Sequence, residues 1–139
     1  IYNFAKFTEW PGDTLAPADP FVMCVIGDAA VGSELERAVR GRAIDGRHIT
    51  VSQGSAGPER RCHVLYVSGV PPGQASQLIG GLRDAPVLTI SDMDRFAELG
   101  GIAQFFFEHG QLRFTVDLES AKRARLQISS RLLALVERQ

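Results

Sequence analysis

An uninterrupted apolar segment, Phe21–Ile26 (FVMCVI), carries no charge and is followed by Gly27-Asp28. A run of this length that is rich in Val, Ile and Phe is typical of a strand buried on both faces. Residues 31–39 then place apolar side chains at helical spacing. A buried strand that leads through Gly-Asp into a helix predicts the first β-α unit of a parallel sheet.

The middle of the chain repeats this alternation of short apolar runs and helical patterns. Helices are predicted at residues 74–82 and, capped by Asp92, at residues 93–99. Residues 41–46 are expected to form a turn and the polar segment 53–61 a surface loop. The predicted strands cover residues 47–51, 62–67 and 86–90.

The last third of the chain has a different pattern. Residues 102–108 and Gln111–Val116 flank His109-Gly110, which predicts an antiparallel hairpin added to the parallel sheet. Asp117 is a candidate cap for a helix that extends to about Arg125. A final amphipathic helix is predicted over residues 129–137. Its apolar side carries Leu132, Leu133, Leu135 and Val136.

Residues 1–10 place apolar side chains close to i, i+3 and i+4, which predicts a short helix that ends at Pro11-Gly12. Its aromatic side chains could form a binding face, although packing onto the sheet explains them more simply. The fold class is therefore α/β, with a mixed, mostly parallel sheet, a C-terminal antiparallel hairpin and flanking helices.

Composition places limits on function. A chain of 139 residues is expected to form a single domain over residues 1–139 with a substantial core. A net charge of −1 argues against a nucleic-acid partner, because such surfaces need clustered excess Lys and Arg. No apolar stretch approaches the roughly 20 residues needed to span a bilayer, so the chain is not expected to be membrane-spanning.

The sequence lacks the motifs of common α/β enzymes. Gly27 and Gly32 have the spacing of a phosphate loop, but no lysine precedes Ser33, and Asp28 would repel a phosphate. A receiver domain would need a lysine after a late strand, and neither lysine of this chain is placed there. The nucleophile elbow G-x-S-x-G is absent, and the three histidines are scattered, so no metal site is indicated. We therefore predict no catalytic residue, no cofactor and no metal.

Besides a protein that acts only by binding other proteins, two functional classes remain open. A small-ligand sensor would need an apolar pocket, for which Phe105, Phe107 and Phe114 are the candidate aromatic lining. An α/β enzyme would need a cluster of polar side chains at the carboxyl ends of the strands. The candidates for that cluster are Asp28, Ser68 and Asp92.

The two cysteines, Cys24 and Cys62, lie in separate predicted strands and do not form a C-x-x-C motif. A bond between them would close a loop of about 39 residues, worth about 4 kcal/mol in the chain-entropy model. Two buried free thiols are the alternative, since cysteine also behaves as a small apolar residue. Spacing alone leaves both states open.

Three blocks, which together span nearly the whole chain in order, resemble the YfiR family of small exported bacterial proteins. The first is Y-N-F-A-K-F at residues 2–7 with E-W-P at 9–11, followed by the strand to Gly27. The second is C-H-V-L-Y-V-S at residues 62–68. The third begins with P-V-L-T-I-S-D at residues 86–92 and continues through Phe96, Gly100-Gly101 and the hairpin to I-S-S-R-L-L at 128–133.

This resemblance implies a non-catalytic periplasmic protein with a mixed sheet flanked by helices, often dimeric. It implies that the chain is exported, with a signal peptide expected ahead of Ile1. The implied partner is the periplasmic part of an inner-membrane diguanylate cyclase, whose cyclic-di-GMP signalling the protein would repress. An outer-membrane lipoprotein would relieve the repression by sequestering the periplasmic protein.

The resemblance also implies a disulfide between Cys24 and Cys62, in line with export to an oxidising compartment. Some members have a second cysteine pair in the C-terminal third, which this chain lacks. The expected contact surface is the C-terminal helix, with Leu132, Leu133 and Val136, together with the aromatic N-terminal helix. Core packing is the alternative role for the same side chains.

Overall fold

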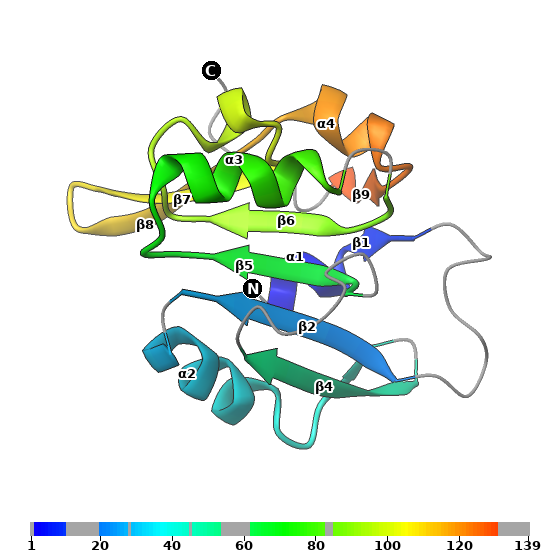
Figure 1. The fold of residues 1–139 in the computed structure, drawn as a ribbon. Helices are drawn as coiled ribbons and strands as arrows, with labels where there is room; N and C mark the ends of the chain where they lie inside the picture. The colour runs from blue at the N-terminus through cyan, green and yellow to red at the C-terminus, as the bar shows by residue number, and fades with distance from the viewer. Residues whose placement is uncertain are drawn as a thin grey trace.

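A seven-stranded mixed sheet dominates the part of the chain that the structure describes, which is residues 2–10, 20–27, 29–44, 46–53, 62–82 and 85–130 of a computed structural model. Its strands are β2 (Phe21–Ile26), β3 (Ala43–Ile44), β4 (Arg47–Gln53), β5 (Val64–Val67), β6 (Leu88–Ser91), β7 (Ala103–Glu108) and β8 (Gln111–Val116). They lie in the order β3-β4-β2-β5-β6-β7-β8 (Figure 1).

The pairing within this sheet matches the predicted class. Strand β2 pairs in parallel with β4 and with β5, and the parallel pattern continues through β6 to β7. Antiparallel pairs add β8 to β7 at one edge and β3 to β4 at the other. The predicted hairpin around His109-Gly110 is confirmed, and both turn residues adopt positive φ, as a tight two-residue turn requires.

Strand β2 is buried at every position except Val22, which is partly exposed. Its alternate side chains contribute to two different apolar cores, one on each face of the sheet, because successive strand residues point to opposite faces. Met23 and Val25 belong to the larger core, whereas Cys24 and Ile26 belong to the smaller one. The prediction of a strand buried on both faces is confirmed.

Helices cover both faces of the sheet. Side chains of α1 (Tyr2–Lys6), α2 (Ala29–Val39) and α4 (Leu118–Arg123) enter the larger core. Helix α3 (Pro72–Gly80) packs its Ala75 into the smaller core. Figure 1 shows α3 and α1 on opposite sides of the sheet. The predicted cap of α4 is also present, because the Asp117 side chain accepts hydrogen bonds from the backbone N–H groups of Glu119 and Ser120.

Two predictions about the helices are wrong. The first helix ends at Lys6 rather than near Trp10, and β1 (Thr8–Glu9) follows it and pairs antiparallel with β9 (Gln127–Ile128). The segment after β6 is a short 3₁₀ helix, η2 (Phe96–Leu99), which begins after Arg95 and has no side-chain cap. The Asp92 carboxylate instead accepts a hydrogen bond from the Ser68 hydroxyl.

Smaller differences concern the ends of elements. The expected turn at residues 41–46 contains the two-residue strand β3. The third predicted strand begins at Val64, so Cys62 and His63 lie just before it. The first residue of the loop predicted at 53–61, Gln53, belongs to β4. The rest of that loop and most of the predicted last helix lie outside the described residues.

Candidate functional site

A disulfide joins Cys24, in the middle of β2, to Cys62, which lies just before β5. The two Cα atoms are 6.0 Å apart, and each residue is only 7% exposed. Both belong to the smaller core, with Leu65 and Val87 among their neighbours. The bond therefore links β2 to the segment that leads into β5, the parallel strand beside β2 in the sheet, and apolar side chains surround it.

The residue after Cys62 strengthens the same junction. The backbone N–H of His63 donates to the Val22 carbonyl at 2.9 Å, and the Val22 N–H donates back to His63 Nδ1 at 3.0 Å. The imidazole stacks on the Phe21 ring with centroids 5.0 Å apart, and Trp10 Nε1 donates to the His63 carbonyl. His63 therefore has a structural role at the start of β5.

A polar cluster does form at the carboxyl ends of β5 and β6. Ser68 Oγ donates to Asp92 Oδ1 at 3.0 Å, and Ser91 Oγ donates to the Val67 carbonyl and accepts from the Met93 N–H. The structure thus brings together two of the three residues considered for an α/β enzyme, while Asp28 lies outside the described residues. These bonds join two strand ends. They do not pair the Ser68 hydroxyl with a histidine or lysine base of the kind that activates a serine nucleophile.

The proposed aromatic pocket is not formed by the three phenylalanines. The rings of Phe105 and Phe114 pack edge-to-face against Phe4, with centroid distances of 6.1 and 5.1 Å. Phe107 lies at the far end of the hairpin and is 78% exposed. The space that Phe105 and Phe114 would have lined is therefore filled by an aromatic side chain of α1.

The same packing decides the role of the N-terminal aromatic residues. Phe4 is 3% exposed, while Tyr2, Phe7 and Trp10 are partly buried and pack against the larger core. The simpler of the two expectations, that this segment packs its aromatics onto the sheet, describes what the structure shows.

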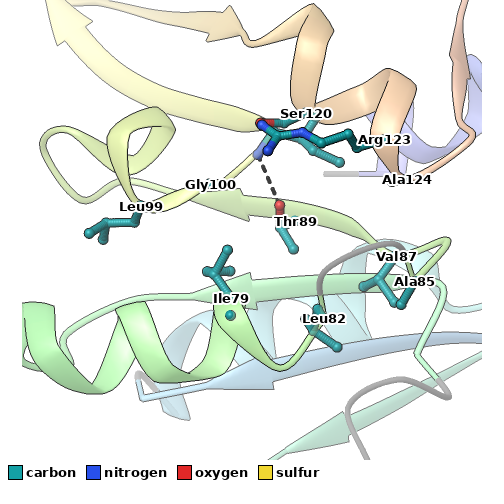
Figure 2. A pocket seen from close by; sticks show the side chains of 12 residues that line it. Ile79, Leu82, Ala85, Val87, Thr89, Leu99, Gly100, Ser120, Arg123 and Ala124 are labelled. Carbon is teal, nitrogen blue, oxygen red and sulfur yellow. Dashed lines mark hydrogen bonds between the residues drawn. The ribbon is translucent and has the colours of Figure 1, made fainter.

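A cavity that the sequence did not reveal lies between α3, β6, η2 and α4 (Figure 2). It has a volume of about 70 Å³. The charged side chain among its described lining residues is Arg123 on α4, and Figure 2 shows this side chain extending above Thr89. The other lining side chains are mostly apolar, and they include Ile79, Leu82, Val87, Leu99 and Ile102.

The three predicted interface residues, Leu132, Leu133 and Val136, lie outside the described residues, so their role stays a prediction. Across the described ranges, no group of three or more His, Cys, Asp or Glu side chains is arranged to hold a metal ion. In the same ranges, no helix has the length and apolar character needed to cross a membrane.

Together these features define a disulfide-bridged mixed α/β domain whose polar side chains at the strand ends are used in structural hydrogen bonds. A family model described as YfiR/HmsC-like matches residues 1–137, and the chain belongs to this family. The resemblance identified from the three sequence blocks is thereby confirmed. The family is one of periplasmic regulators rather than enzymes. No curated protein matches the chain.

Proposed function

We propose that this protein is a non-catalytic periplasmic regulator. In this proposal it binds the periplasmic part of an inner-membrane diguanylate cyclase and represses cyclic-di-GMP signalling. The observation that carries the proposal is the family match over residues 1–137. The hydrogen bonding of Ser68, Ser91 and Asp92 is compatible with it, because these side chains stabilise the ends of strands rather than form a reactive pair.

The disulfide fits the same proposal. Disulfides form and persist in the oxidising bacterial periplasm and are rare in the cytosol. We propose that Cys24 and Cys62 become bonded after export. Mass spectrometry of freshly exported, unalkylated protein, with and without reductant, measures this directly. A gain of two mass units on reduction is expected, and two free thiols before reduction would contradict it.

Binding to the cyclase is tested with the purified protein and the periplasmic domain of a membrane diguanylate cyclase encoded beside it. Isothermal titration calorimetry is expected to give saturable binding in the micromolar range or tighter. In cells, deletion of the gene is expected to raise cyclic-di-GMP. An absence of binding at micromolar concentrations, together with unchanged cyclic-di-GMP, would overturn the proposal.

The proposed contact surface is the C-terminal segment that carries Leu132, Leu133 and Val136. Leu132→Asp is expected to weaken binding at least tenfold, because a buried interface position does not tolerate an unpaired charge. Leu118→Asp is the matched control, since Leu118 is an apolar side chain that is 52% exposed on α4. Equal effects of the two substitutions would refute this choice of surface.

Two further parts of the proposal concern assembly. An outer-membrane lipoprotein is expected to compete with the cyclase for the protein, and a homodimer is expected in solution. Analytical ultracentrifugation of the protein alone, and of its mixture with a co-encoded lipoprotein, measures both. A monomer throughout would remove the dimer from the proposal.

A further inference from the structure

The cavity between α3, β6, η2 and α4 combines mostly apolar walls with one charged side chain among the described residues, that of Arg123. The apolar wall residues come from different elements: Ile79 from α3, Leu82 from the turn after it, Val87 from the segment before β6, Leu99 from η2 and Ile102 from the segment before β7. Figure 2 shows Ile79 and Leu82 on the opposite side of Thr89 from Arg123. Among the residues that the structure describes, no carboxylate lines the cavity.

Arg123 leaves most of its hydrogen-bonding capacity available. A guanidinium has five N–H donors, and among the described residues its Nη2 donates a 3.3 Å hydrogen bond to Ser120 Oγ. In the part of the chain that the structure describes, no carboxylate lies within 4.0 Å of this guanidinium, whereas Arg37 pairs with Glu34 and Arg113 with Glu108. Within the described ranges, Arg123 is therefore an exposed cation beside the cavity with no acidic partner.

A second polar group faces the same space. Thr89 Oγ1 accepts a hydrogen bond from the Ile102 N–H at 2.9 Å, which leaves its own hydroxyl proton for another acceptor. Thr89 is buried, at 4% exposure. The guanidinium of Arg123 and the hydroxyl of Thr89 therefore supply donors at one side of a cavity whose other lining side chains are mostly apolar, with Ser120 as a further polar one.

Size and charge together indicate the class of ligand. A volume of about 70 Å³ holds roughly five water-sized groups, which is too little for a nucleotide or a large aromatic molecule. A guanidinium binds a carboxylate in a bidentate manner with favourable geometry. We propose that this cavity binds a short-chain aliphatic monocarboxylate, with its carboxylate on Arg123 and its alkyl chain against Ile79, Val87 and Ile102. This proposal does not depend on the cyclase partner.

The test is a titration of the intact protein with butyrate at low ionic strength. Binding is measured by calorimetry and by the methyl and amide NMR signals of the protein. Saturable binding is expected, with a Kd in the millimolar range or tighter. Shifts are expected at the Ile102 amide, together with contacts from the ligand methyl group to the Ile79 and Ile102 methyl groups. Butanol and butylammonium, which keep the chain but lose the negative charge, are expected to bind at least tenfold more weakly.

Two substitutions on neighbouring positions of α4 separate the role of the guanidinium from general charge. Arg123→Gln is expected to raise the Kd for butyrate at least tenfold while the thermal unfolding temperature stays unchanged. Lys122→Gln is the control, because Lys122 is exposed like Arg123 but does not line the cavity, and it is expected to leave the Kd within twofold of the original. No butyrate binding, equal binding of butanol, an unaffected Kd in Arg123→Gln, or NMR shifts located elsewhere would each overturn the proposal.

Discussion

Reduction of the disulfide between Cys24 and Cys62 is expected to remove a large part of the free energy of unfolding. The two cysteines are 38 residues apart in the sequence. In the chain-entropy model, a closed loop of this length lowers the entropy of the unfolded chain and thereby raises its free energy by about 4 kcal/mol. Typical domains are stable by only about 5–15 kcal/mol, so the reduced protein should be close to marginal stability.

Little in the folded state should offset this loss. Both cysteines are 7% exposed in the smaller apolar core, where two thiols can stay buried as small apolar groups. The backbone hydrogen bonds between β2 and β5 do not depend on the sulfur atoms. The expected loss in free energy of unfolding therefore arises mainly from the unfolded state. We expect the reduced protein to keep the same fold.

Urea unfolding followed by circular dichroism, with and without a phosphine reductant, measures the effect. With a slope of roughly 2 kcal/mol per molar urea, the midpoint should fall by roughly 2 M. A Cys24→Ala/Cys62→Ala variant is the control, and the reductant should leave its midpoint unchanged. If reduced and oxidised protein unfold within about 1 kcal/mol of each other, the loop-closure reasoning fails for this chain.

Five further substitutions at four positions test the packing and the cap. Gly101→Ala should destabilise the fold by about 1–3 kcal/mol, because its Cβ would overlap the buried ring of Phe96; thermal unfolding measures this, and an unchanged Tm would contradict it. Phe4→Ala should cost about 3–5 kcal/mol by leaving a cavity against the larger core, whereas Phe107→Ala, at a side chain 78% exposed, should stay within about 0.5 kcal/mol. Asp117→Ala should cost about 1 kcal/mol and Asp117→Asn much less, since asparagine also caps helices; equal losses in urea unfolding would exclude a capping role.

The sequence predicted those parts of the fold that depend on local patterns. The apolar run Phe21–Ile26, the His109-Gly110 turn and the Asp117 cap are each determined by neighbouring residues, and each was identified. The first helix was extended too far because Thr8–Glu9 pairs with a segment near the other end of the chain. A helical periodicity over ten residues contains no information about such a distant partner.

The side-chain environments were harder to predict. Phe105, Phe107 and Phe114 alternate in the way that suits one face of a hairpin, but only a distant contact shows that Phe4 fills the space beside two of them. Arg123 gave no signal at all, because an arginine in the last turn of a helix is common. Its position beside the cavity depends on how the tertiary fold places α4 relative to β6, η2 and α3, which all line the same space.

The pairing of β1 with β9 bears on the order in which the chain folds. Thr8 lies opposite Ile128, so nearly the whole domain must be positioned before these two strands can meet. Closing so long a loop costs more chain entropy than pairing β7 with β8 across a two-residue turn. We expect the hairpin to form early and the β1–β9 pair to form last, and to open first under native conditions. Amide hydrogen exchange at Glu9 and Gln127 should therefore be faster than exchange at the centre of β5.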